Sequence, residues 1–280
     1  MNLQAEIDNL FSSQMKKWEQ LRNGIKQLDD TEEKVITWGD GFNVKIQFNP
    51  ARMVSTSAKI DKESIENRPC FLCEANRPAL QKGILFMEKY IILCNPFPIL
   101  RNHLTIPLHS HVPQLIRNKV GDMLSLAEQL PDYVLFYNGP KCGASAPDHF
   151  HLQAGLKSPQ LLQGDNVLRS CLMIESGNKS EVEELFEDVY QYLHHRQPKE
   201  DEPMMNIIAY IEQNRYKLNL FPRKAHRPRQ YYENGSKQLL ISPGALDMAG
   251  MIICVREEDF KKIGTHDIED IYSQVSLPVI

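Results

Sequence analysis

The stretch GASAPDHFHLQAG constrains the fold more than any other part of this sequence. It places two histidines one residue apart, and a glutamine two residues further on, directly after a loop rich in glycine, alanine and serine. Because successive side chains of a strand point to opposite faces, His149, His151 and Gln153 are predicted to share one face. Phe150 and Leu152 then form the opposite, apolar face. This alternation fits a strand that lines a site, and it also fits an edge strand whose polar residues face water.

The chemistry of these residues favours a phosphoryl-transfer site. A neutral imidazole nitrogen on a rigid strand can attack phosphorus without prior deprotonation. The charge that builds up on the phosphoryl oxygens must then be met by hydrogen-bond donors. Backbone amides of Gly143, Ala144 and Ser145 can supply them, and small side chains let a phosphate approach closely. Gln153 adds a side-chain donor. The sequence has no G-x4-GK-[ST] segment, which argues against phosphate binding by a P-loop.

Composition limits the kinds of partner. The 280 residues suffice for one large domain or two smaller ones. A net charge of -4 predicts neither general nucleic-acid binding nor binding to a membrane surface. The N-terminus lacks a basic region followed by an apolar core, and no apolar run approaches the roughly 18 residues of a membrane span. We therefore expect a cytoplasmic protein.

Hydrophobic periodicity predicts a mixed α+β architecture. Apolar residues between Phe11 and Leu28 recur at spacings of three and four, which is typical of one amphipathic helix. Alternation around Gly39-Asp40-Gly41 predicts a β-hairpin. GILFMEKYIILC predicts two short strands or one interrupted strand, and DYVLFYNG a buried strand. VPQLIRNKVGDMLSLAEQL predicts a helix that starts at Val112, and SEVEELFEDVYQYLHHR predicts another. QPKEDEP is typical of a charged linker.

Two segments, LTIPLHSHVPQL and LNLFPRKAHRPRQY, share a strand, a proline, a histidine four residues later and a second proline. The matching positions are Pro107, His111 and Pro113 in the first segment and Pro222, His226 and Pro228 in the second. We therefore predict a duplicated α+β unit whose second copy lacks its own His-x-His. The two halves would meet in one extended sheet.

The segment NG-x3-GAS-x-PDHFHLQ resembles the His-x-His-x-Gln branch of the histidine-triad (HIT) superfamily. That branch comprises galactose-1-phosphate uridylyltransferase, diadenosine tetraphosphate phosphorylase and the GDP-hexose phosphorylases. CFLC resembles the upstream Cys-x-x-Cys of the uridylyltransferases, and ISPGALDMAG a C-terminal segment of the phosphorylases. The resemblance covers most of residues 34–255, strongly at the motif and thinly elsewhere. It implies a HIT-like α+β fold of two pseudo-repeated halves, with a mainly antiparallel sheet and packed helices.

The resemblance also implies roles for individual residues. His151 would be the nucleophile that forms a nucleotidyl-histidine, and Gln153 would hold the phosphate oxygens. His149 would ligate a metal or hold the loop. Asn138 stands where the family has an asparagine before the loop, and Gly143 to Ser145 would form the loop itself.

A metal site is a separate prediction. Cys70 and Cys73, in a chain without an export signal, indicate a metal site or two buried thiols rather than a disulfide. The resemblance to the uridylyltransferases implies a structural zinc held by Cys70, Cys73, His109 and His149, a ligand set that zinc accepts. His111 is the alternative to His109, and two packed thiols without metal are the alternative to zinc.

Basic side chains are candidates for contacts with a polyphosphate. They are Arg52, Arg223, Lys224 and Arg227, and the competing interpretation is an ordinary charged surface.

The resemblance predicts a nucleotidyltransferase or phosphorylase that acts on a nucleotide sugar or dinucleoside polyphosphate. The acceptor would be inorganic phosphate or a sugar phosphate, and no organic cofactor is expected. Asp148 before the first histidine, and Phe150 between the two, favour the phosphorylase side. The alternatives are a nucleotide hydrolase of the same fold and a nucleotide-binding protein without turnover. A homodimer is one candidate assembly.

The predicted domain organisation has three parts. Residues 1–33 form an N-terminal helix, residues 34–175 the half that carries the motif, and residues 176–280 the second, degenerate half.

Overall fold

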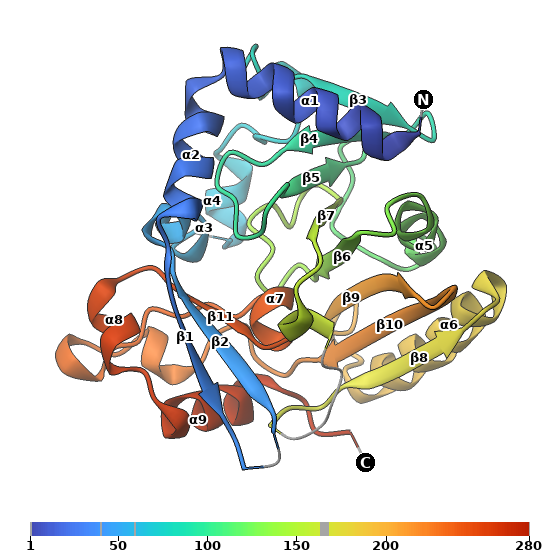
Figure 1. Cartoon of the computed structure of the whole chain (residues 1–280). Coiled ribbons are helices and arrows are strands. Elements are labelled where there is room, and N and C mark those ends of the chain that lie inside the picture. Colours follow the sequence, from blue (N-terminus) through green and yellow to red (C-terminus); the bar gives the residue numbers. More distant parts are fainter. Residues whose placement is uncertain (1, 40, 59, 163–167, 280) are drawn as a thin grey trace.

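The computed structural model describes residues 2–39, 41–58, 60–162 and 168–279, and in these residues an eight-stranded antiparallel sheet forms the centre of the protein (Figure 1). In spatial order its strands are β3 (Gly83–Phe86), β4 (Tyr90–Cys94), β5 (Leu104–Pro107), β7 (His151–Leu156), β6 (Tyr133–Asn138), β9 (Met205–Glu212), β10 (Arg215–Pro222) and β8 (Leu172–Ser176). The fold is therefore α+β, as the sequence predicts.

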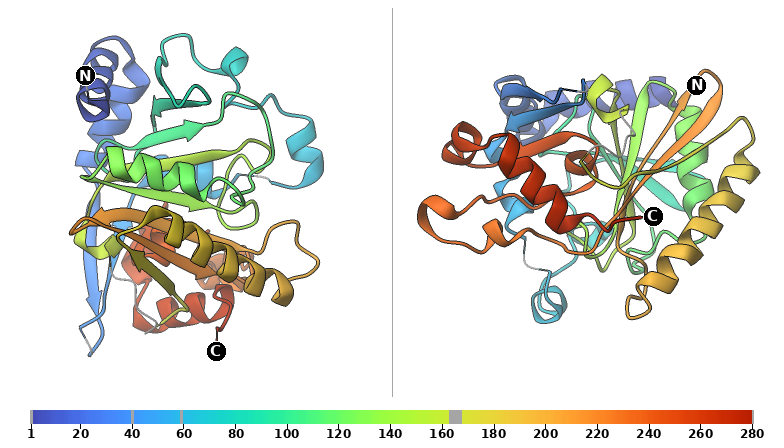
Figure 2. Two further views of the ribbon diagram at one scale, coloured as in Figure 1. Left: turned by 90° about the vertical axis from the view of Figure 1, so that its right-hand side faces the viewer. Right: turned by 90° about the horizontal axis from the view of Figure 1, so that it is seen from below.

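Two units of the same topology lie side by side in this sheet. In the first, the chain runs β5, α5 (Val120–Gln129), β6 and β7, and the spatial order of the strands is β5-β7-β6. In the second, it runs β8, α6 (Lys179–Arg196), β9 and β10, and the order is β8-β10-β9. The units meet where β6 pairs with β9. Figure 2 shows α5 and α6 against the same face of the sheet.

This topology corrects the alignment of the repeat. It makes β10 the counterpart of β7, whereas the alignment of Pro107 with Pro222 equates β10 with β5. The shared proline and histidine spacing is therefore not a structural equivalence. β10 contains no histidine, so the second unit has no counterpart of the His-x-His strand.

The large sheet is covered on both faces. Tyr133, Leu135 and Tyr137 of β6 pack toward α5, α6 and α1 (Leu3–Lys17), while Val134 and Phe136 pack toward the C-terminal elements. This alternation follows from the two-residue period of a strand. The C-terminal elements on the second face are α7 (Ala245–Met248), α8 (Glu257–Lys262) and α9 (Thr265–Val275), together with a small sheet of β1 (Glu32–Thr37), β2 (Asn43–Phe48) and β11 (Met251–Cys254).

The predicted strands of the first half are confirmed. β1 and β2 form the expected antiparallel hairpin, and β2 also pairs in parallel with β11. β3 and β4 form a tight hairpin, and β6 is buried along its whole length. The remaining short helices are α3 (Met53–Thr56), α4 (Lys62–Glu66) and 3-10 turns at Pro50–Arg52, Glu74–Asn76, Pro159–Leu162, Arg229–Tyr231 and Gly235–Lys237.

The N-terminal segment forms two helices rather than the single helix predicted. α1 ends at Lys17, and α2 (Glu19–Asp29) starts after Trp18, whose backbone is extended. α1 packs over β3, whereas α2 lies directly on the backbone around Pro96, where a Cβ on Gly24 would come within 2.0 Å of the Pro96 carbonyl oxygen. One straight helix cannot make both contacts.

One further prediction about local structure is wrong. The helix predicted to start at Val112 starts only at Val120, because Asn118 adopts a positive φ of 65° and the preceding residues form a loop. The segment QPKEDEP is an irregular connection between α6 and β9, as predicted for a linker, but it is partly buried, since the Glu202 side chain is 3% exposed. Its carboxylate accepts hydrogen bonds from the Ile116 backbone N–H and the Tyr137 hydroxyl, both at 2.5 Å.

The domain boundaries drawn from the sequence stay a prediction. The topology assigns β8 to the second unit, and β2, the partner of β1, also pairs with β11 from the C-terminal part. Within the described ranges, no helix combines the length and the apolar character needed to cross a membrane.

Gly24→Ala should destabilise the protein, although glycine-to-alanine changes in helices usually stabilise by roughly 0.5–1 kcal/mol. The new Cβ would overlap the Pro96 carbonyl, and such overpacking costs roughly 1–3 kcal/mol. Denaturant unfolding measures the change. Gly177→Ala is the matched control, because a Cβ there meets nothing within 4 Å. A Gly24→Ala protein as stable as the wild type would show that α2 does not rest on this backbone.

Candidate functional site

Two adjoining cavities lie on the face of the large sheet that carries Gln153. The larger has a volume of about 730 Å³ and the smaller of about 50 Å³. Arg52, Asn138, Gly143 and Gln153 line both, and His151 lines the larger one. Residues predicted from the motif, the loop and the basic positions therefore meet at one place.

The polar face predicted for the motif holds for two of its three residues. Phe150 and Leu152 are fully buried in the core on the other face of the sheet. His151 and Gln153 both line the larger cavity. His149 precedes β7 and lies outside both cavities, so it does not share their face.

The large sheet forks at His151. The pairing of β6 with β7 ends at Phe136 and Gln153, and its continuation would pair Asn138 with His151. The buried carboxamide of Gln114 takes the place of that pair. Its Oε1 accepts from the His151 N–H at 2.7 Å, and its Nε2 donates to the carbonyls of His151 and Asn138, each at 3.0 Å. Gln114 therefore acts as an inserted peptide group that holds the two strands apart.

The hydrogen bonds of His151 define its tautomer. Its Nδ1 lies 2.9 Å from the backbone carbonyl oxygen of His149, which can only accept, so Nδ1 carries the proton. Burial lowers the pKa of His151 to about 4, so the ring is neutral near pH 7. Nε2 therefore keeps its lone pair, as a nucleophile requires.

Two side-chain amides line both cavities. The Oδ1 of Asn138 accepts from the Ala245 backbone N–H at 2.7 Å and from the Asn206 side chain at 2.9 Å. The Oε1 of Gln153 lies 3.0 Å from a ring nitrogen of His103. Because protein groups occupy the oxygen atoms, the NH₂ groups are the ends left to meet a ligand.

The loop before the motif reaches the cavities as predicted. Gly143 lines both, Ala144 lines the smaller and Ser145 the larger. Gly143 has a positive φ of 94°, and a Cβ there would lie 2.9 Å from the Cα of Gly244. The loop therefore needs glycine at 143, both for its conformation and for its close approach to the start of α7.

Arg52 is the cation best placed for an anionic ligand. One guanidinium N–H donates to the Phe97 carbonyl at 2.8 Å, and the side chain lines both cavities. Burial lowers its pKa to about 10, which still leaves it charged at neutral pH. A half-buried cation at the wall of a cavity favours an anionic ligand beside it.

Arg223, predicted to bind substrate, is a structural residue instead. It is fully buried and lines neither cavity. Its guanidinium donates to Asn206 Oδ1 and to four backbone carbonyls, those of Pro243, Ala225, His226 and Val275. Of its two basic neighbours, Lys224 is exposed and Arg227 lines the smaller cavity.

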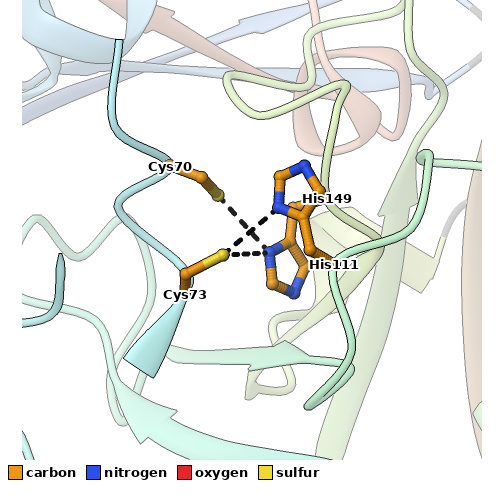
Figure 3. Close-up of side chains that lie close together, drawn as sticks. All are labelled: Cys70, Cys73, His111 and His149. Carbon is orange, nitrogen blue, oxygen red and sulfur yellow. Dashed lines mark hydrogen bonds between the residues drawn. The ribbon is translucent and has the colours of Figure 1, made fainter. Parts of the chain in front are cut away.

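A cluster of two cysteines and two histidines lies beside the site (Figure 3). Cys70, Cys73, His111 and His149 each offer one ligand atom, and these atoms lie within 4.8 Å of one another. His111, the alternative in the sequence-based prediction, belongs to this group, and His109 does not. His109 is exposed on the neighbouring turn.

The geometry of this cluster suits a tetrahedral ion. Sulfur-to-Nδ1 distances are 3.4 Å for Cys70 and His149, 3.5 Å for Cys73 and His149, and 3.2 Å for Cys73 and His111. A tetrahedral zinc ion separates its sulfur and nitrogen ligands by about 3.5 Å. The His149 Nε2 donates to the Leu108 carbonyl at 2.8 Å, which leaves Nδ1 unprotonated and free to ligate.

One side of the larger cavity is apolar. Its walls include Trp18, Val54, Phe71, Leu72 and Phe97, and Phe71 is 47% exposed at the surface. Aromatic and aliphatic side chains of this kind suit a flat apolar ligand group, while the amides and Arg52 suit a charged one.

Sequence reasoning missed three buried polar residues of the site. His103 and Gln114 hold motif residues, and Asp247 lines the smaller cavity, where its carboxylate accepts from the backbone N–H groups of Gly244 and Ile253. A signal for His103 exists in HLTIP, where polar and apolar residues alternate as they do in the motif strand. Gln114 and Asp247 carry no comparable signal.

Comparisons with known proteins agree with this fold. A family model described as "Domain of unknown function (DUF4922)" matches residues 10–156. No curated protein matches the chain. Crystal structures of yeast Ap4A phosphorylase Apa2 are similar at 17% identity over 99% of this chain. The first of these structures has a TM-score of 0.64, the complex with AMP 0.64 and the complex with Ap4A 0.66. The match covers 95%, 97% and 98% of those chains, respectively. This likeness shows the fold, which is HIT-like as predicted.

Arg223→Met should unfold the protein more easily and should not act through the ligand. It leaves several buried acceptors unsatisfied, each worth about 1–3 kcal/mol, so a total loss of at least about 3 kcal/mol is expected. Denaturant unfolding measures the loss. Lys224→Met, at the exposed neighbour, is the control and should be close to neutral. Unchanged stability with weakened nucleotide binding would restore Arg223 as a substrate residue.

Proposed function

The chain belongs to the DUF4922 family, and we propose that it is an enzyme that transfers a nucleotidyl group through a covalent intermediate on His151. The substrate is a dinucleoside polyphosphate or a nucleotide sugar, and the acceptor is inorganic phosphate. One observation carries the proposal: a neutral histidine with an available Nε2 lines a cavity beside two amide NH₂ groups and a half-buried arginine.

The first step is attack on the α-phosphorus. The Nε2 lone pair of His151 forms a bond to phosphorus, and the bond from phosphorus to the bridging oxygen of the leaving group breaks. The leaving group departs as a nucleoside polyphosphate or sugar phosphate. The imidazole becomes positively charged, and the His149 carbonyl, which accepts its Nδ1–H, stabilises that charge.

The second step regenerates the histidine. An oxygen of inorganic phosphate attacks the phosphorus, the phosphorus–nitrogen bond breaks, and a nucleoside diphosphate leaves. In both steps, negative charge on the non-bridging oxygens meets the amides of Gln153 and Asn138, the backbone N–H groups of the loop, and Arg52.

The similarity to yeast Ap4A phosphorylase supports the choice of substrate class. That protein has been crystallised with AMP and with Ap4A, and the structural match to it covers 99% of this chain. The apolar wall of the larger cavity offers a surface for a base.

A nucleotide labelled on the α-phosphate should attach its label to the wild-type protein when no acceptor is present. The bond should be acid-labile and alkali-stable, as a phosphorus–nitrogen link is. His151→Ala should abolish labelling and turnover, while His109→Ala, at an exposed histidine outside the site, should leave both unchanged. Gln153→Ala should keep the nucleophile and slow labelling by roughly 10²–10³-fold.

The identity of the acceptor distinguishes a phosphorylase from a hydrolase. Release of a nucleoside diphosphate only with added phosphate supports phosphorolysis, and release of a nucleoside monophosphate without phosphate would identify a hydrolase. Nucleotide binding without label or turnover would identify a binding protein. Labelling that survives His151→Ala would exclude the mechanism.

We further propose that Cys70, Cys73, His111 and His149 hold a structural zinc ion. Four protein ligands leave no open position, so the ion would stabilise the fold rather than take part in the reaction. It would also fix the position of His149, whose carbonyl binds the nucleophile.

His111→Ala should lower the zinc content of the purified protein from about one ion per chain, because a structural zinc needs four ligands. It should also lower the thermal midpoint. His109→Ala is the matched control, since it removes a nearby histidine outside the cluster. Metal analysis provides a readout that does not depend on activity. A metal-free preparation of the wild-type protein with full stability would contradict the proposed zinc site.

A further inference from the structure

His103 lies behind the site, where it contacts neither cavity. It directly precedes β5 and is 1% exposed. β5 pairs with the motif strand β7 so that Thr105 lies opposite Gln153. His103 is therefore a diagonal neighbour of Gln153 on the same face of the sheet, within reach of its side chain.

The two hydrogen bonds of His103 define its tautomer. The backbone N–H of Ile99 donates to Nδ1 at 3.0 Å, so Nδ1 carries no proton. Nε2 lies 3.0 Å from the Oε1 of Gln153. In a neutral ring the proton then sits on Nε2, which donates to that oxygen.

The surroundings of His103 keep the ring neutral. Burial and the positive charge of Arg52 lower its pKa to about 3. The ring also packs against Phe136, with the two ring centroids 5.5 Å apart. No change of protonation near neutral pH can therefore reverse the direction of the hydrogen bond to Gln153.

This bond selects between two orientations of the Gln153 amide. The oxygen and nitrogen ends of a carboxamide have nearly the same size, so packing alone distinguishes them poorly. With Oε1 bound by His103, the NH₂ end faces the cavity and can donate to phosphoryl oxygens. In the opposite orientation Oε1 would face those oxygens, and acceptor would meet acceptor.

We propose that His103 is a positioning residue that fixes the Gln153 amide with its NH₂ group toward the reacting phosphoryl oxygens. The expected effect of His103 on the reaction rate rests on the proposed function. The orientation of the Gln153 amide by His103 does not depend on it. It adds a residue to the site that touches neither the substrate nor the nucleophile.

Two variants distinguish the hydrogen bond made by Nε2 of His103 from the one made by its Nδ1. His103→Gln can place an NH₂ group where Nε2 lies, so it keeps a donor for Gln153. His103→Asn can place an oxygen where Nδ1 lies, so it keeps the acceptor for Ile99 but cannot reach Gln153. In His103→Asn, the labelling of His151 should slow by at least about 10-fold, with little change in KM. The upper limit is the loss of roughly 10²–10³-fold that is expected when a donor to the phosphoryl oxygens is removed altogether. His103→Gln should retain most of the wild-type rate.

The same variants in a Gln153→Ala background test whether His103 acts through Gln153. There, His103→Asn and His103→Gln should have the same rate, because no amide remains to be oriented. A purely structural role for His103 would produce the same loss in both backgrounds. Equal losses would therefore overturn the proposal.

Nuclear magnetic resonance of selectively labelled histidine tests the proposal without turnover. Wild-type His103 should be the Nε2–H tautomer at neutral pH, and a proton on Nδ1 would overturn the inference. If the wild-type protein forms no labelled intermediate, the proposed function fails and this tautomer still decides the role of His103. In that case AMP affinity, measured by calorimetry, replaces rate in the comparison of variants: a loss in His103→Asn that persists unchanged in Gln153→Ala contradicts the proposal.

Discussion

The carboxamide of Gln114 keeps the large sheet open at the point where His151 and Asn138 would otherwise pair. A regular ladder there would bury both backbones against each other. The inserted side chain satisfies the backbone groups of both residues, so the strands can separate without leaving unpaired buried donors or acceptors. β6 then continues against β9, and β7 continues against β5. The separation leaves His151 and Asn138 at the edge of the cavities.

Each polar side chain of the site is oriented by a hydrogen bond to one of its two ends, and the other end is left to face the cavities. A carbonyl binds Nδ1 of His151, an imidazole binds Oε1 of Gln153, and a backbone N–H binds Oδ1 of Asn138. What remains toward the cavities is one lone pair and two NH₂ groups. Such preorganised donors stabilise developing negative charge without rearrangement during a reaction.

His149 connects the metal-ligating cluster with the nucleophile. Its ring lies with Cys70, Cys73 and His111, and its backbone carbonyl binds His151. The two histidines of the motif therefore belong to two neighbouring sites, His149 to the cysteine–histidine cluster and His151 to the cavity. The strand begins only after His149, and the preceding turn directs that ring away from the cavity. Arg52 approaches the same centre from a distant segment of the chain.

Local patterns in the sequence predict the class of the fold and several residues that line the cavities. The alternation of FHLQ placed Phe150 and Leu152 in the core and His151 and Gln153 on the cavity, because a strand has a fixed two-residue period. The glycine-rich loop and the cysteine pair likewise carry local signals. Three features become visible only in the folded chain. Arg223 donates to five acceptors, His111 rather than His109 lies with the cysteines, and the N-terminal helix breaks at Trp18. The tertiary structure also supplied His103, Gln114 and Asp247. Each of these depends on partners far away in the sequence, and the period of a helix or strand holds no information about which distant backbone will lie against it.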